Sequence, residues 1–245
     1  MSSRNIDYRE RKDIILGIVV ENYVKTVNPI SSNFISQECP IDLSSATIRN
    51  ILAELEEEGY LTHPHTSAGR IPTQIGYRYY VDHLMHEIEL LEEEKKQVKD
   101  EYQTHVLELG ALFEKTSEVL SDLTHYASIV SVDGWNDRIF YRGTSHIVGY
   151  PEFHDLTKIQ YILHALEEKE RILEIINRDL QEKIKIYIGA ELQFSEMDGC
   201  SLVVSSYHSA RGPSGKIAVL GPTRMDYGRV ISVVDYFSKL MTEVI

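Results

Sequence analysis

The chain has 245 residues and a formal net charge of −13 at pH 7, and 42% of its residues are hydrophobic. This length allows one or two domains, and the hydrophobic content is enough for a core. The negative charge argues against a protein that coats nucleic acid over its whole surface, although a local cationic face can still read DNA.

The N-terminus and the cysteines indicate a cytoplasmic protein. The first residues, MSSRNIDYRERKD, are charged and lack the apolar segment of a secretory signal. The sequence contains no apolar run of about 18 residues, so no membrane span is expected. Cys39 and Cys200 form no Cys-x-x-Cys pair, and we expect reduced thiols rather than a disulfide.

Three amphipathic helices are predicted first in chain order. Residues 8–25 place apolar side chains at helical spacing, and the helix should end before Pro29 because the residue preceding proline disfavours helical backbone. Ser31 is suited to cap a second helix. A third begins near Ser44 and ends at Gly59. Because a tight turn joins the last two helices, we expect a helix-turn-helix.

A two-stranded wing is predicted directly after the third helix. Residues 60–63 and 70–72 are typical of short strands, and the sequence TSAG between them is typical of a turn. The stretch HPHTSAGRIPT, residues 63–73, would then form the tip of the wing. Thr73 is placed to cap a fourth helix over residues 74–91.

The rest of the chain predicts a helical stretch and an α+β domain. Residues 92–126 repeat apolar side chains every three or four positions, and this stripe needs a partner helix in the same chain or in a second subunit. One helix is expected over 155–180 and a final one over 227–245. Five β-rich segments predict a mainly antiparallel sheet: 127–132, 138–143, 183–189, 200–207 and 215–221.

The organisation that follows has three parts. Residues 1–88 form a winged-helix DNA-binding domain, residues 89–126 a helical linker or dimerisation helix, and residues 127–245 a regulatory or dimerisation domain. The expected fold class is α+β.

The third predicted helix has the pattern of a DNA-reading helix. Its apolar face would pack on the first two helices, while Arg49 and Asn50 point the other way, where arginine can pair with guanine and asparagine with adenine. The acidic residues 54–58 would be repelled by phosphate, so the helix should enter a groove by its N-terminal half. Ser44 and Ser45 at the helix start suit a phosphate. The alternative is an exposed helix of any helical bundle.

The wing adds further candidate contacts. Its hydroxyl, histidine and arginine side chains are suited to phosphates and to the minor groove, and Arg78 begins the next helix. The complete set of predicted DNA-binding residues is Ser44, Ser45, Ala46, Thr47, Arg49, Asn50, His65, Thr66, Ser67, Arg70 and Arg78.

Other residues that could carry chemistry have simpler interpretations. His63 and His65, with Cys39 as a third ligand, fall short of the four closely spaced ligands of a structural zinc site. A nucleophile pair of Cys200 and His208 is conceivable, but Cys200 opens a β-rich segment and is expected in the core. The sequence SARGPSGKIAVLGP departs from the P-loop pattern and predicts a hairpin turn. We therefore expect no enzyme, no metal and no cofactor.

Three segments resemble a known family. Residues 43–85, LSSATIRNILAELEEEGYLTHPHTSAGRIPTQIGYRYYVDHLM, resemble the winged-helix segment of the heat-inducible transcription repressor HrcA family. The string PHTSAGRIPT followed by GYRYYVD is long and specific. The sequence PEF at 151–153 and the segment 200–240 agree with the same family, so the resemblance covers both ends of the chain.

The resemblance implies more than the residue pattern does. It implies a repressor of heat-shock and chaperone operons that binds a CIRCE-type inverted-repeat operator as a homodimer. It also implies a GAF-like C-terminal domain and modulation by a GroE-type chaperonin, which keeps the repressor active. The family has a longer middle region, and in this sequence ASIVSVDGWNDRIFYRG runs almost directly into PEF, so the inserted segment is expected to be missing or reduced.

An alternative function shares the DNA-binding part. In this interpretation a small-molecule ligand of the C-terminal domain switches the regulator. No cluster of polar residues in 127–245 identifies such a ligand, and a fold alone does not define a function.

Overall fold

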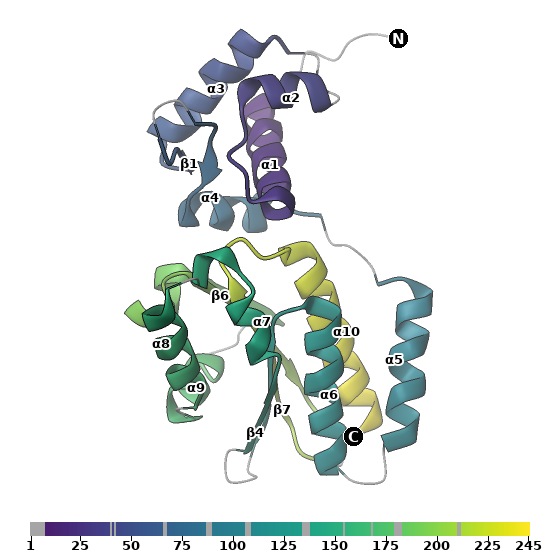
Figure 1. Cartoon of the computed structure of the whole chain (residues 1–245). Coiled ribbons are helices and arrows are strands. Elements are labelled where there is room, and N and C mark those ends of the chain that lie inside the picture. Colours follow the sequence, from purple (N-terminus) through teal and green to yellow (C-terminus); the bar gives the residue numbers. More distant parts are fainter. Residues whose placement is uncertain are drawn as a thin grey trace. The chain divides into compact units, whose positions relative to one another are not determined.

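The computed structural model describes the chain except residues 1–7, 40, 42, 66–67, 87–89, 106–108, 134–137, 154, 168, 179–182 and 210–211. It divides the chain into two compact units, Met1–His86 and Glu87–Ile245. Each is described by itself (Figure 1). In the described residues, none of the helices combines the length and the apolar character needed to cross a membrane.

The first unit consists of helices and one small sheet. Its elements are α1 (Tyr8–Thr26), α2 (Ser32–Glu38), α3 (Ser45–Glu57), β1 (Leu61–Thr62), β2 (Ile71–Pro72), α4 (Gln74–Tyr79) and the π-helical turn η1 (Tyr80–Leu84). The expected helix starts are confirmed, because Ser31, Ser44 and Thr73 each accept a hydrogen bond from a backbone N–H three residues later. Gly59 follows α3 with φ of 83°, a left-handed conformation that glycine adopts without strain.

The predicted fourth helix over 74–91 was too long. The α-helix ends at Tyr79, a π-turn follows, and the backbone is extended at Met85. The hydroxyls of Tyr79 and Tyr80 both donate to carboxylates on α1, at 2.9 Å and 3.4 Å respectively. These contacts with another helix favour a local widening of the helix into a π-turn, which the apolar periodicity of the segment did not indicate.

The second unit places helices on both faces of an antiparallel sheet. Its five strands are β3 (Ala127–Val132), β4 (Arg138–Arg142), β5 (Ile184–Ile188), β6 (Cys200–Tyr207) and β7 (Gly215–Pro222). They lie in the order β4-β3-β7-β6-β5, and every neighbouring pair is antiparallel. The expected α+β class with an antiparallel sheet is confirmed, and so is the hairpin between β6 and β7.

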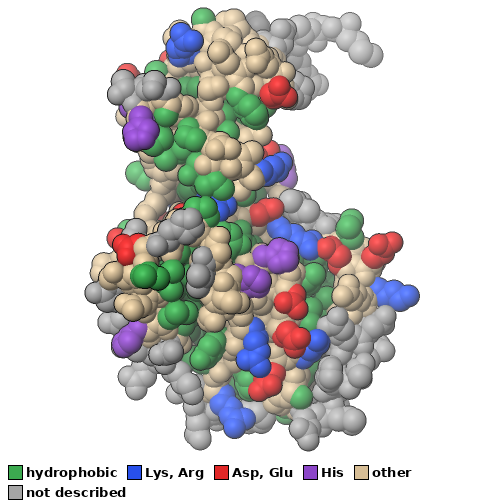
Figure 2. Space-filling model, in the orientation of Figure 1, with side chains coloured by type: hydrophobic (Ala, Val, Ile, Leu, Met, Phe, Trp, Pro, Cys, Tyr) green, Lys and Arg blue, Asp and Glu red, His purple; other side chains and the backbone are tan. Residues whose placement is uncertain are grey.

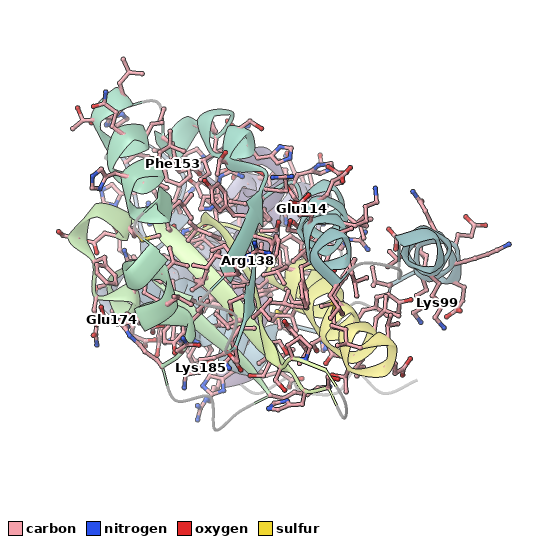
Figure 3. All side chains as sticks on the ribbon, turned by 90° about the horizontal axis from the view of Figure 1, so that it is seen from below. Lys99, Glu114, Arg138, Phe153, Glu174 and Lys185 are labelled. Carbon is pink, nitrogen blue, oxygen red and sulfur yellow. The ribbon has the colours of Figure 1, made fainter. Side chains whose placement is uncertain are left out.

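The helices of this unit form layers (Figure 3). Those that follow β4 cover one face of the sheet: α7 (Thr144–Val148), η2 (Pro151–Phe153), α8 (Leu156–Glu167) and α9 (Lys169–Ile176). The opposite face carries α6 (Leu109–Thr124) and α10 (Tyr227–Val244), and α5 (Glu92–His105) lies outside α10. Two short turns, η3 (Gly189–Leu192) and η4 (Ser195–Met197), connect β5 to β6.

Two predicted long helices are each divided in the structure. The segment 155–180 forms α8 and α9 because both bury their apolar sides in the same core, which one straight helix of that length does not do. The segment 92–126 forms α5 and α6. The apolar stripe of α6 is covered within the chain by the sheet and α10, with Leu112, Phe113 and Leu120 at most 1% exposed.

Cys200 has the predicted core position. It opens β6, is 1% exposed, and belongs to the cluster that α8 and α9 cover. Burial raises the pKa of its thiol to about 12, so the group stays protonated at neutral pH. Because His208 follows the other end of this eight-residue strand, roughly 25 Å away at the usual rise per residue, the two do not form a nucleophile pair.

Candidate nucleic-acid interface

Helix α3 has one buried face and one exposed face. Ile48, Ile51, Leu52 and Leu55 are at most 5% exposed and pack toward α1 and α2. This is the face that the sequence predicted to be buried. The other side is therefore free to meet a partner.

The exposed side of α3 carries most of the predicted contact residues. Ser44, Ala46, Arg49 and Asn50 are exposed, and Thr47 is half-buried. Small side chains next to Arg49 and Asn50 allow the helix backbone to approach a flat base edge closely. The structure thus brings the predicted base-reading residues together on the N-terminal half of one helix.

The start of α3 is tied by hydroxyl groups. Ser44 Oγ accepts a hydrogen bond from the Thr47 backbone N–H at 3.1 Å and lies 2.9 Å from Thr47 Oγ1. Ser45 Oγ lies 2.8 Å from Ser36 Oγ on α2. The serine cap satisfies one of the N–H groups of the first turn, so an incoming phosphate would meet the remaining ones, on Ser45 and Ala46.

The acidic end of α3 is neutralised within the unit. Lys12 on α1 pairs with Glu54 at 3.2 Å and also with Glu58. Tyr8 donates to Glu54 at 2.5 Å, and the hydrogen bonds from Tyr8 and Lys12 hold the pKa of Glu54 below its usual value. The negative charge that would repel DNA is therefore drawn toward α1, while the N-terminal half of the helix stays uncharged apart from Arg49.

The hairpin between β1 and β2 is joined to α3 by Arg70. Its Nη2 lies 2.7 Å from Glu56 Oε2, and His63 Nδ1 contacts the other oxygen of the same carboxylate. The strands pair as Leu61 with Pro72 and Thr62 with Ile71. Arg70 was predicted to contact phosphate; in this structure its guanidinium faces Glu56.

The remaining predicted contacts lie apart from the exposed side of α3. His65 is exposed in the hairpin, and Thr66 and Ser67 lie outside the described residues. Arg78 lies on α4 and pairs with Asp82 one turn later at 3.2 Å. The structure therefore places the predicted α3 residues on one exposed helix side. DNA contacts by the hairpin and α4 residues stay a prediction.

Sequence reasoning missed the residues that hold the site together. No role was predicted for Lys12, and Glu56 was placed only in the acidic end of the third helix. The signal for Glu56 was its position inside an acidic run immediately before a segment with histidine and arginine. Pairing partners could not be chosen from spacing because all these contacts cross between elements.

His63, His65 and Cys39, which the sequence indicated to be too few for a structural zinc site, form no metal-binding group in the described part of the chain. No group of three or more histidine, cysteine, aspartate or glutamate side chains there could hold a metal ion. Cys39 is half-buried in the first unit, and both cysteines are free thiols. Burial raises the pKa of the Cys39 thiol, and the nearby Glu38 acts in the same direction.

The second unit offers a different kind of surface. Figure 2 shows basic and acidic side chains interspersed on its visible face. Lys115 pairs with Glu118 at 3.4 Å along α6, and Arg142 of β4 lies 3.8 Å from Glu114. Mixed charge of this kind lacks the continuous positive potential that binds a phosphate backbone.

Comparisons with known proteins agree with the sequence segments noted above. A family model described as HrcA protein C terminal domain matches residues 132–231. Two relatives named heat-inducible transcription repressor HrcA, from Carboxydothermus hydrogenoformans and Pelotomaculum thermopropionicum, are 29% and 28% identical and align over 98% and 96% of this chain and of their own lengths. A crystal structure described as that of a hypothetical protein has a TM-score of 0.75 over 96% of this chain and 98% of its own, at 19% identity, which shows a shared fold.

The alignments also bear on the expected missing segment. They extend over 338 and 335 positions, more than the 245 residues of the chain. The two relatives therefore contain residues without a counterpart in this chain, as expected if the family insert is missing or reduced. The near-complete coverage and the matching C-terminal model show that the chain is similar, over nearly its whole length, to proteins named heat-inducible transcription repressor HrcA.

Proposed function

We propose that this protein is a sequence-specific transcriptional repressor that binds an inverted-repeat, CIRCE-type operator of heat-shock or chaperone operons as a homodimer. The names of the relatives, heat-inducible transcription repressors, support the regulatory role. The single observation that carries DNA binding is the division of α3 into an exposed polar half, with Arg49 and Asn50, and an acidic half paired with α1 and the hairpin.

The first part of the chain, residues 1–88, would then act as a winged-helix domain. The N-terminal half of α3 enters the major groove, where Asn50 and Arg49 read base edges. The start of α3 and the hairpin contact the phosphates on either side. The hairpin pairs one strand directly after α3 with another directly before α4, as a wing requires.

The remaining parts would supply dimerisation and regulation. Residues 89–126 form the helical connection, and residues 127–245 form a GAF-like domain. Since the apolar stripe of α6 is buried within the chain, the two-fold contact must be made by other surfaces. A dimer reads two half-sites, which predicts a palindromic operator.

A gel-shift experiment with the full chain tests the proposal. The double variant Arg49→Ala with Asn50→Ala should lose specific binding to the inverted repeat and keep only weak binding that is the same for any duplex. The matched control is Arg142→Ala, which removes a cation of the same kind from the exposed strand β4 of the second unit. If the double variant binds the inverted repeat as tightly as the parent, α3 is not the reading helix.

Regulation by a GroE-type chaperonin is proposed from the family resemblance, with a small-molecule ligand as the alternative. In the second unit, Arg224 pairs with Glu152 and lies over the ring of Tyr150. The Tyr150 hydroxyl donates to the His125 carbonyl at 2.8 Å, so these polar groups have partners within the chain and give no support to a ligand there. Two measurements separate chaperonin regulation from ligand regulation: thermal unfolding and operator binding, each made with chaperonin and with a metabolite panel. A metabolite that changes both, with chaperonin changing neither, would overturn the chaperonin proposal.

A further inference from the structure

We propose that Glu56 is a positioning residue for DNA binding: its carboxylate fixes the β1–β2 hairpin against the reading helix α3. The inference rests on the proposed function. It assigns a role to a residue that DNA itself would repel.

The geometry places Glu56 at a junction of three elements. It lies in the last turn of α3, and its two oxygens accept from different partners. Oε2 is 2.7 Å from Arg70 Nη2, and Oε1 contacts His63 Nδ1. His63 follows β1 and Arg70 precedes β2, so one carboxylate holds both sides of the hairpin.

The backbone of Arg70 is held from another direction. Its N–H donates to the carbonyl of Ile30 at 2.8 Å, and the Ile30 N–H donates back at 2.9 Å. A Cβ on Gly69 would lie 2.5 Å from the Ile30 carbonyl carbon, so the close approach depends on glycine there. Arg70 is thus fixed by its main chain to the segment before α2 and by its side chain to α3.

The contacts of Glu56 with Arg70 and His63 are partly buried, so their loss costs free energy. The side chains of Arg70 and Glu56 are 23% and 24% exposed, and that of His63 is 35% exposed. Arg70 Nε is buried and has no hydrogen-bond partner among the described residues. Because water reaches this guanidinium only in part, loss of the carboxylate would leave a poorly solvated charge and favour a different position of the hairpin.

The proposal predicts that neutralising Glu56 changes DNA affinity in the direction opposite to the one that simple electrostatics predicts. If Glu56 acted only as a negative charge near DNA, its neutralisation would strengthen binding. If Glu56 positions the hairpin, neutralisation weakens binding even though repulsion is also removed. Glu57 is the matched control, because it is the next acid on the same helix and is exposed.

The test compares Glu56→Gln and Glu57→Gln in the full chain, on a duplex that carries the inverted repeat. We expect Glu57→Gln to bind as tightly as the parent or more tightly, and Glu56→Gln to bind about tenfold more weakly at the same salt concentration. Glu56→Asp, which keeps the charge on a shorter side chain, should recover part of the loss. Equal or tighter binding by Glu56→Gln would overturn the proposal.

A measurement without DNA keeps this inference separate from the proposed function. Hydrogen exchange at the Arg70 and Ile30 amides reports whether the hairpin stays hydrogen-bonded to the segment before α2. We expect exchange to be about tenfold faster in Glu56→Gln than in Glu57→Gln, with circular dichroism showing that both variants are folded. Unchanged exchange would refute the positioning role. If the parent binds no duplex, the proposed function fails, and the exchange result still decides the role of Glu56.

Discussion

The carboxylate of Glu152 and the guanidinium of Arg224 form an ion pair although the two residues are 72 positions apart, with Arg224 Nη2 donating to Glu152 Oε2 at 3.3 Å. Glu152 belongs to the PEF segment, and Arg224 follows β7. Both segments carry the resemblance to the HrcA family, and the structure shows that they meet. The Arg224 guanidinium also lies 5.3 Å from the centre of the Tyr150 ring.

The first prediction concerns this pair. The side chain of Arg224 is 9% exposed and that of Glu152 is 26% exposed. Arg224→Ala removes a buried guanidinium and leaves the partly buried Glu152 carboxylate without its partner, so it should lower the free energy of unfolding of the second unit by about 2 kcal/mol. Urea unfolding followed by the fluorescence of the chain's aromatic residues measures it.

The control for that experiment is Arg142→Ala. The Arg142 and Glu114 side chains are 53% and 60% exposed and 3.8 Å apart, so water already solvates both. Loss of this ion pair should change the free energy of unfolding by less than about 0.5 kcal/mol. Equal effects of the two substitutions would contradict the importance of burial.

The second prediction concerns base reading by α3. Asn50 is exposed on the polar half of the helix, so Asn50→Ala should leave the fold unchanged. It should cost about 1–3 kcal/mol of binding free energy at one base position of each half-site and relax the preference there. Binding to a set of operators, each with a single base changed, would reveal the position. A uniform loss across all operators would indicate a phosphate contact instead.

The third prediction uses two glycines as a matched pair. An added Cβ at Gly69 meets the Ile30 backbone at 2.5 Å, whereas at Gly17 within α1 nothing lies within 4 Å. Gly69→Ala should therefore displace the hairpin and weaken DNA binding. Gly17→Ala should stabilise the first unit by about 1 kcal/mol, since alanine favours helix. Thermal unfolding and gel shift of both variants check the contrast, and similar effects would show that the close approach is not required.

The fourth prediction concerns the pH dependence of the contact between α5 and α10. Glu94 accepts from Arg229 at 3.0 Å, and this hydrogen bond holds the pKa of Glu94 below its usual value of 4.5. A lowered pKa in the folded state means that the stabilisation is complete above 4.5 and is lost as the pH falls through the lowered pKa. Unfolding of the parent and of Glu94→Gln should differ at neutral pH and converge in acid.

A stability difference between these two proteins that stays constant down to acid pH would exclude the ion pair as its source. Tyr236, whose hydroxyl donates to the Lys95 carbonyl at 3.0 Å, also joins α5 to α10 and should be unaffected by this titration. Tyr236→Phe is therefore a useful comparison, because it should lower stability equally at neutral and at acid pH.

Local signals in the sequence were sufficient for much of the fold. Caps at Ser31, Ser44 and Thr73 marked helix starts because a side-chain oxygen satisfies a backbone N–H only a few residues away. Strands β3 and β6 were predicted with their observed bounds, since β-branched runs between turn residues are a local pattern. The buried face of α3 followed from its period.

The errors arose where distant contacts outweighed local preference. The fourth helix ends early because its tyrosines bond to α1, and the segment 155–180 divides because α8 and α9 both cover the same core. The sequence alone determined the capped helix starts, the bounds of β3 and β6 and which side of α3 is apolar, because those depend on neighbours within a few positions. Only the tertiary structure decided that Glu56 faces Arg70, that Lys12 draws the acidic end of α3 toward α1, and that Glu152 meets Arg224. Charge pairing acts through space, and the chain order of the residues does not encode which opposite charge folding brings within reach.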